Sequence, residues 1–189
     1  SFRTLAGEQA GGALFNQIKE FATTTPMLMQ DLAKGAQTLL AFNIPVEQVM
    51  TTLRQIGDIS MGNSQKFNSL VLSFAQMSSA GKLMGQDLMQ MINAGFNPLS
   101  EISAKTGKSI GVLKDEMSKG AISVDMVKEA FASATSEGGK FYGMLESQSK
   151  TIKGSLSNLQ GAWDDMLNSI GEQTQGVLIS GISAVQSAV

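Results

Sequence analysis

Hydrophobic residues recur along this chain at the three- and four-residue spacing of an amphipathic α-helix, and strand-like alternation is almost absent. Over residues 45–56, for example, Val46, Val49, Leu53 and Ile56 fall on one stripe. The spacing predicts about eight short helices, over residues 12–22, 26–42, 45–56, 64–79, 84–94, 98–106, 110–119 and 124–135. Helices this short are marginal alone in water, so tertiary packing must stabilise them. The pattern therefore predicts an all-α fold built as a compact array of short helices.

Residues with special backbone preferences stand at the ends of these runs. Prolines precede three of the helices, where a first-turn proline sacrifices no hydrogen bond: Pro26, Pro45 and Pro98. Glycines that would end a helix follow six of them: Gly57, Gly81, Gly95, Gly107, Gly120 and Gly138. Asn43 can take the left-handed conformation that closes a helix. Ser109 and Ser123 stand where N-caps belong, which supports the predicted helix starts.

From Met144 onward the apolar positions follow a different rhythm. They alternate at spacings of four and three, the a/d pattern of a heptad repeat, for more than three heptads. These positions are Leu145, Ser149, Ile152, Leu156, Leu159, Trp163, Met166 and Ile170. We predict one long helix here, with the apolar members as a candidate interface seam. The spacing leaves open whether this helix packs on its own domain or pairs with a second chain.

Two domains are therefore expected. Residues 1–143 form the compact helical domain, and residues 144–189 form the long helix leading into an apolar segment. Residues 173–189 carry no charge, but this run is shorter than the roughly 20 residues that span a bilayer. The chain begins without an initiator Met and ends inside an apolar pattern, so we expect it to be a piece of a longer protein.

The composition excludes most of the common kinds of catalytic site. The chain has no His and no Cys, which excludes Ser-His-Asp, Cys-His and zinc-hydrolase sites within it. Its net charge is −2 and its lysines are scattered, which weighs against sequence-specific nucleic acid binding. Neighbouring acids, at 115–116 and 164–165, point about 100° apart on a helix and cannot clamp one cation well. We predict no enzymatic activity, no cofactor and no metal site.

Two segments invite a functional interpretation. The run LMGQDLMQM contains Met84, Met89 and Met91, which could form a soft docking surface but more often fill an irregular core. The glycine-rich residues 136–143 lack the spacing of a phosphate-binding loop. A helix-ending turn that places Phe141 and Tyr142 against the bundle is preferred there.

Long segments of the sequence resemble the region near the N-terminus of phage tail tape measure proteins. They include ATTTPMLMQDLAKGAQTLLAFNIPVEQV, GQDLMQMINAGFNPL, ATSEGGKFYGM and QSKTIKGSLSNLQGAWDDML, and together they cover about residues 23–166. The resemblance implies a long structural protein that lies in the lumen of the virion tail, sets tail length and is ejected ahead of the DNA. It also implies tail tube, tail chaperone or baseplate proteins as partners, with assembly in the host cytoplasm.

Three functional hypotheses follow from the residues and the resemblance together. The first is a structural domain of the tail ruler. The second is a helical docking module for a tail chaperone, tube or baseplate protein, with self-association through the C-terminal helix as a further contact. The third is a membrane-active segment of the parent protein that aids DNA entry.

Overall fold

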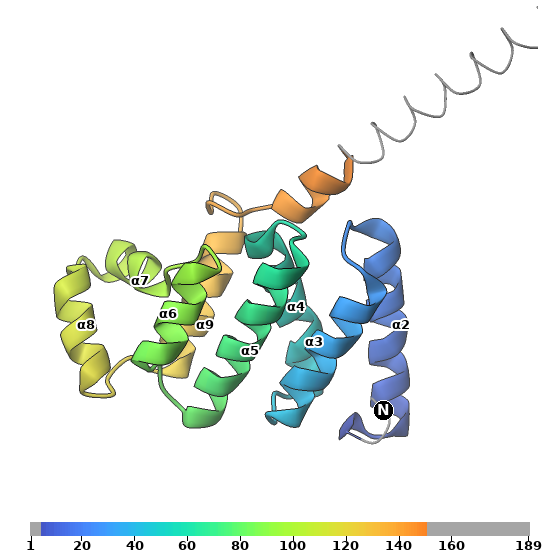
Figure 1. Cartoon of the computed structure of the whole chain (residues 1–189), viewed down its shortest axis with the longest axis horizontal. Helices are drawn as coiled ribbons and strands as arrows, with labels where there is room; N and C mark the ends of the chain where they lie inside the picture. Colours follow the sequence, from blue (N-terminus) through green and yellow to red (C-terminus); the bar gives the residue numbers. More distant parts are fainter. Residues whose placement is uncertain (1–4, 151–189) are drawn as a thin grey trace, which may run out of the picture. The chain divides into compact units, whose positions relative to one another are not determined.

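The computed structural model describes residues 5–150, and no strand forms among them (Figure 1). The chain divides into two units, residues 1–149 and 150–189, and all of the labelled helices belong to the first. They are α2 (Glu8–Thr24), α3 (Met29–Ala41), α4 (Val46–Ser60), α5 (Ser64–Ala80), α6 (Gly85–Asn93), α7 (Pro98–Thr106), α8 (Ile110–Ser118) and α9 (Val124–Thr135). A further helix begins at Met144 and continues to Lys150, where the described residues end. The all-α prediction is confirmed, whereas most of the long heptad helix lies outside the described residues.

Several helix ends agree with the sequence prediction. The helices α7 and α9 have the predicted bounds, and Pro98 occupies the first turn of α7. The hydroxyls of Ser109 and Ser123 accept the N–H groups of Val112 and Met126, which makes both serines N-caps. Asn43 takes the left-handed conformation just after α3, with φ 62°.

Three predicted helix ends are wrong. The helix α2 begins at Glu8, four residues before the predicted start at residue 12. Pro26 lies outside α3, which begins three residues later at Met29, and its ring packs instead against Gly62. Gly57 does not end α4, because the helix continues to Ser60. Gly57 is buried inside the helix beside the side chain of Leu145, so its role is to leave room for a neighbour.

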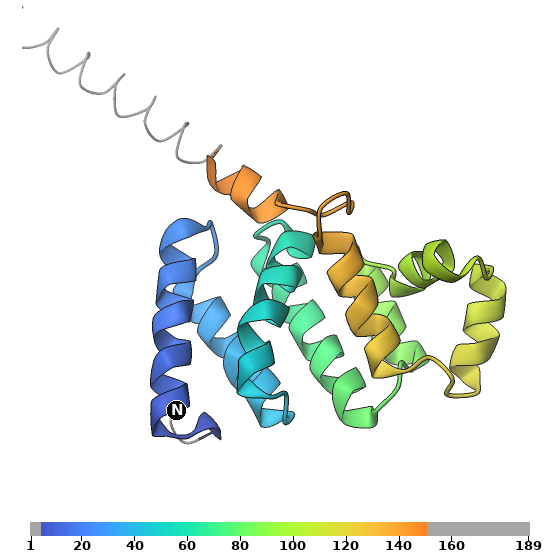
Figure 2. The same ribbon diagram turned by 180° about the vertical axis from the view of Figure 1, so that it is seen from behind.

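The helices of the first unit form two layers, which Figures 1 and 2 show from opposite sides. One layer contains α3, α5 and α6, and the other contains α2, α4 and α9. The helices α7 and α8 follow α6, and α7 packs on α9. From α2 to α6 the chain reverses direction at each connection, so consecutive helices lie side by side and not end to end.

An aromatic cluster joins segments that are distant in the sequence. The ring centroid of Phe131 lies 5.3 Å from that of Phe74 and 4.5 Å from that of Phe96, both in edge-to-face geometry. Phe141 adds a third edge contact, 6.2 Å from Phe96. Edge-to-face pairs contribute about 0.5–1.5 kcal/mol beyond the area they bury. The cluster ties α5, the α6–α7 connection, α9 and the turn after α9 into one core.

Candidate interaction surfaces

The first candidate surface is the strap, residues 144–149, with which the C-terminal helix begins. Leu145 is only 3% exposed, and its Cδ2 atom would lie 2.9 Å from a Cβ atom at Gly57. Its Cδ1 atom faces Gly62, where a Cβ atom would lie 3.6 Å away. Leu145 is therefore seated in a notch that two glycines keep open in the first unit.

Polar contacts hold the strap at both of its ends. The backbone N–H of Leu145 donates to Oδ1 of Asp58 at 3.0 Å, and the buried hydroxyl of Ser149 donates to the carbonyl of Thr24 at 3.1 Å. The carboxylate of α4 thus caps the first turn of a helix 87 residues away in the sequence, where amide groups lack intrahelical partners.

The electrostatic setting of Asp58 is mixed. Burial raises the pKa of its carboxyl group above the ordinary value, and the nearby Glu146 raises it further. The N–H of Leu145 and the guanidinium of Arg54 lower the pKa, but they do not cancel the effect of burial. Ionisation of Asp58 therefore lowers the stability of the folded state.

Most of the predicted seam lies beyond the strap. Ile152, Leu156, Leu159, Trp163, Met166 and Ile170 fall outside the described residues, and so does the uncharged segment 173–189. The interface seam and its possible pairing with a second chain therefore stay predictions. For Leu145 the structure shows contacts with α4, within the first unit.

The second candidate surface is the α5–α6 face. Leu72 on α5 is 41% exposed and Met89 on α6 is 56% exposed, and Met84 just before α6 is also exposed. The preference for core packing is therefore wrong for Met84 and Met89, which lie on the outward side, and right for the buried Met91. Spacing alone could not separate them, because it does not say which stripe of a helix faces its neighbours.

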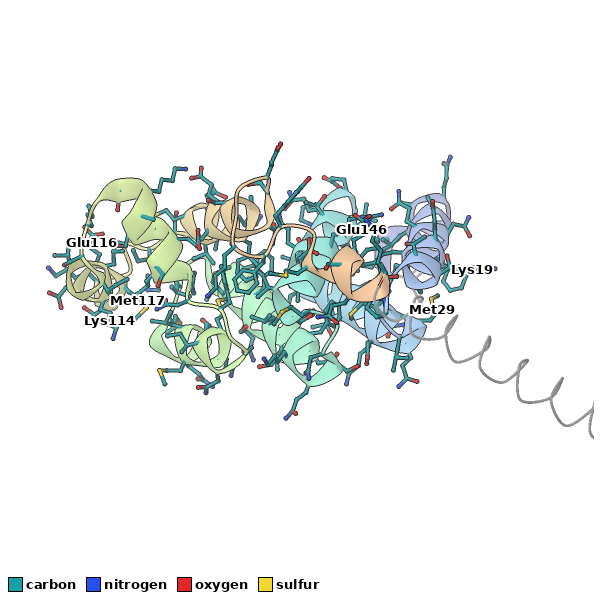
Figure 3. The ribbon with its side chains drawn as sticks, turned by 90° about the horizontal axis from the view of Figure 1, so that it is seen from above. Lys19, Met29, Lys114, Glu116, Met117 and Glu146 are labelled. Carbon is teal, nitrogen blue, oxygen red and sulfur yellow. The ribbon has the colours of Figure 1, made fainter. Side chains whose placement is uncertain are left out.

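Charge is scarce on this face. Along α5 the outward stripe consists of Gln65, Ser69, Leu72, Gln76 and Ser79. Within residues 64–93 the charged residues are Lys66, Lys82 and Asp87, and Asp87 is buried. By contrast, Figure 3 shows Lys19 on α2 and both Lys114 and Glu116 on α8. Exposed Met and Leu with few charges are typical of the centre of a protein interface.

The glycine-rich turn after α9 has a structural explanation. A Cβ atom at Gly139 would lie 2.4 Å from the carbonyl oxygen of Ser133, so no side chain fits there. The N–H of Phe141 donates to the carbonyl of Ala134 at 2.8 Å, and the ring of Phe141 is buried. The prediction is confirmed for Phe141 and wrong for Tyr142, which is 59% exposed because the turn sends it to the outside.

Polar side chains, among them Ser78, Asp125 and Lys128, line a hollow among the described residues. This open hollow of about 480 Å³ lies between the α3–α4 connection, the end of α5 and the start of α9, and Lys128 at its edge bonds to Gln48 at 2.9 Å. In residues 5–150 there is no group of three or more acidic, His or Cys side chains that could hold a metal ion. Over the same residues, no helix has the length and apolar character needed to cross a membrane.

An all-α unit that exposes Leu72, Met84 and Met89 on the α5–α6 face, which carries few charges, fits the class of structural and docking proteins. The comparison with known families gives the particular one. The tape measure protein family matches residues 3–172, so this chain belongs to that family and is part of a phage tail protein. This confirms the resemblance noted in the sequence. No curated protein and no solved structure matches the chain significantly.

Proposed function

We propose that this chain is a non-enzymatic part of a tape measure protein that lies in the tail lumen, determines tail length during assembly and is ejected ahead of the DNA. The observation that carries the proposal is the family match over residues 3–172, which extends past the first unit into the heptad-patterned sequence. An α-helix supplies about 1.5 Å of length per residue, which suits a molecular ruler. Family membership itself supports a structural role in the tail.

The two parts of the chain would have different roles in setting tail length. In the first unit the helices fold back in two layers, so added residues there would add little reach. The measured length would then come from sequence that follows Lys150. Inserting about 40 helix-forming residues after that point in the parent protein should lengthen the tail by roughly 60 Å. Tails of unchanged length in electron micrographs would refute the ruler function for this protein.

A docking function is the second candidate, and the α5–α6 face favours it. Its exposed Leu72 and Met89 stand on a surface with few charges, whereas the exposed Val112 stands on the charge-bearing α8. The partner would be another tail component, such as a chaperone, tube or baseplate protein. The Leu72→Glu/Met89→Glu double variant should block tail assembly, because a charge at the centre of an interface opposes its burial.

The matched control for docking is Val112→Glu, which places the same charge on α8. Both variants should retain the far-UV circular dichroism spectrum and unfolding midpoint of the original chain, because all three side chains are exposed. Normal tail assembly by the double variant, with folding intact, would reject the docking function and leave the ruler function standing.

Self-association through the candidate seam is proposed for the C-terminal part. Heptad-spaced apolar side chains such as Leu156 and Trp163 stabilise helix pairs when they meet a second copy. Multi-angle light scattering should show a concentration-dependent oligomer, accompanied by a shift in the fluorescence of Trp163. A monomer at all concentrations would exclude this contact.

A further inference from the structure

We propose that the strap is a release point: residues 144–149 detach from α2 and α4 as one piece while α2–α9 stay folded. Release would uncouple the strap from these helices without unfolding them. This inference goes beyond the proposed function and does not depend on it, because it rests on contacts within residues 5–150.

The strap has an independent anchor immediately before it. Phe141 is held by the hydrogen bond from its N–H to Ala134 and by its buried ring, which contacts Phe96. Gly139 fixes the same turn through its donation to the carbonyl of Ser136 at 2.8 Å. These contacts belong to α9 and the aromatic cluster and do not involve the strap. The N–H of Met144 also donates to the carbonyl of Phe141 at 3.3 Å, which is a local hydrogen bond across the hinge. Detachment of the strap would therefore leave the turn in place.

Between the anchor and the strap lies a short segment suited to act as a hinge. Tyr142 is exposed, and Gly143 has a φ of 62°, with nothing within 4 Å of the position of a Cβ atom. Glycine populates such positive φ angles as readily as negative ones. The space beside the α-carbon of Gly143 is therefore open.

Release would uncover two buried side chains of the strap, Leu145 and Ser149, and the half-buried Met144. Leu145 leaves the notch at Gly57, and its N–H leaves Asp58, both on α4. The hydroxyl of Ser149 leaves the carbonyl of Thr24 at the end of α2. The N–H of Ser147 donates to the carbonyl of Gly143 in the hinge, and this local hydrogen bond involves neither α2 nor α4, so it can persist when the strap detaches. Segments with few buried contacts open locally, well before global unfolding.

Thiol labelling can separate local release from global unfolding. The chain has no cysteine, so the Ser149→Cys and Ser73→Cys variants each carry one thiol. The two serines are matched, because both are buried and both donate to a backbone carbonyl, Ser149 on the strap and Ser73 in the centre of α5. In the full 189-residue chain, the thiol on the strap should react with a disulfide reagent on the order of 100-fold faster than the one in α5.

The urea dependence of labelling decides between the two kinds of opening. Below the unfolding midpoint, labelling of the Ser149→Cys variant should depend little on urea, because release exposes little surface. Labelling of the Ser73→Cys variant should rise steeply, because it requires global unfolding. Equal rates with equal urea slopes would overturn the proposal.

A second measurement uses the unmodified chain and avoids any effect of the substitutions on folding. The amide protons of Leu145 and Phe141 are both hydrogen-bonded and lie four residues apart, one on the strap and one in the anchor. In residue-resolved hydrogen exchange, the Leu145 amide should exchange at least tenfold faster than the Phe141 amide. Exchange of both amides at one common rate would show that strap and anchor open together, which contradicts a separate release point.

Discussion

At the scale of single residues, glycines mark places where two parts of the backbone come too close for a side chain. Gly139 is the clearest case, because a methyl group there would overlap the carbonyl groups of Ser133 and Ala134. These neighbours are backbone atoms at the end of α9 and cannot rotate away. The two consecutive glycines in this turn thus have different roles: Gly138 supplies a φ of 84°, and Gly139 supplies space.

Gly139→Ala is expected to lower the free energy of unfolding by about 3 kcal/mol, as over-packing against rigid neighbours does. Gly12→Ala is the matched control, because Gly12 lies inside α2 with nothing within 4 Å of its Cβ position. There the substitution should raise the free energy of unfolding by about 0.5–1 kcal/mol through helix propensity. Urea titration measures both, and equal effects of the two substitutions would contradict the close approach at Gly139.

Asp58 gives a second prediction at this scale. Asp58→Asn keeps an oxygen that can accept the Leu145 N–H and removes the half-buried charge, whereas Asp58→Ala removes the acceptor. At pH 7 the Asn variant should be at least as stable as the original chain, and the Ala variant should be about 1 kcal/mol less stable.

The pH dependence follows from the raised pKa of Asp58. The folded state binds the proton of the Asp58 carboxyl group more tightly than the unfolded state does. Protonation of Asp58 therefore stabilises the folded state fully below the ordinary pKa of 3.8, and this contribution is lost as the pH rises through the folded-state pKa. The advantage of Asp58→Asn should therefore grow from pH 3.8 upward and then level off. Thermal melts across this range measure it. A stability difference between the Asp58→Asn variant and the original chain that does not change with pH would show that the Asp58 carboxyl group has an unshifted pKa.

At the scale of the helices, local caps decide where several of them begin. Asn63, Asn97, Ser109 and Ser123 each accept a backbone N–H in the first turn of the helix that follows. Because helices of 9 to 17 residues are marginal alone, each cap contributes a measurable part of their stability.

Ser123→Ala is expected to cost about 1 kcal/mol, because it removes the acceptor for the N–H of Met126 at the start of α9. Ser118→Ala, at the exposed last residue of α8, should change the free energy of unfolding by less than about 0.5 kcal/mol. Chemical denaturation of the two variants side by side tests this. Similar costs at both sites would mean that the Ser123 hydroxyl does not stabilise α9 as a cap.

Helix ends that depend on local caps could be predicted from the sequence, whereas ends that depend on distant contacts could not. The start of α9 is encoded within a few residues, by Ser123 and the apolar run after it. The role of Gly57 is not, because it depends on Leu145, a residue 88 positions later that reaches it only in the folded chain. Pro26 was misassigned for a similar reason, since its contact with Gly62 becomes evident only in the tertiary structure.

At the scale of the whole molecule, the sequence predicted the fold class and the family, but not the strap or the α5–α6 face. Asp58 carries no local signal, because its partner is an amide from another helix. The exposure of Leu72 and Met89 depends on which sides of α5 and α6 the other helices cover. The absence of His and Cys, in contrast, limits the chemistry of the chain however it folds.

Tail length measured by electron microscopy tests most directly whether the first unit is a compact structural domain outside the measured length. The same insert of about 40 helix-forming residues, worth roughly 60 Å if extended, would be placed between Gly107 and Lys108 in the exposed α7–α8 connection of the parent protein. With the insert in the α7–α8 connection, we expect assembled tails of unaltered length, in contrast to the longer tails expected from the insertion after Lys150. Tails that lengthen by roughly 60 Å with the insert in the α7–α8 connection would contradict this expectation.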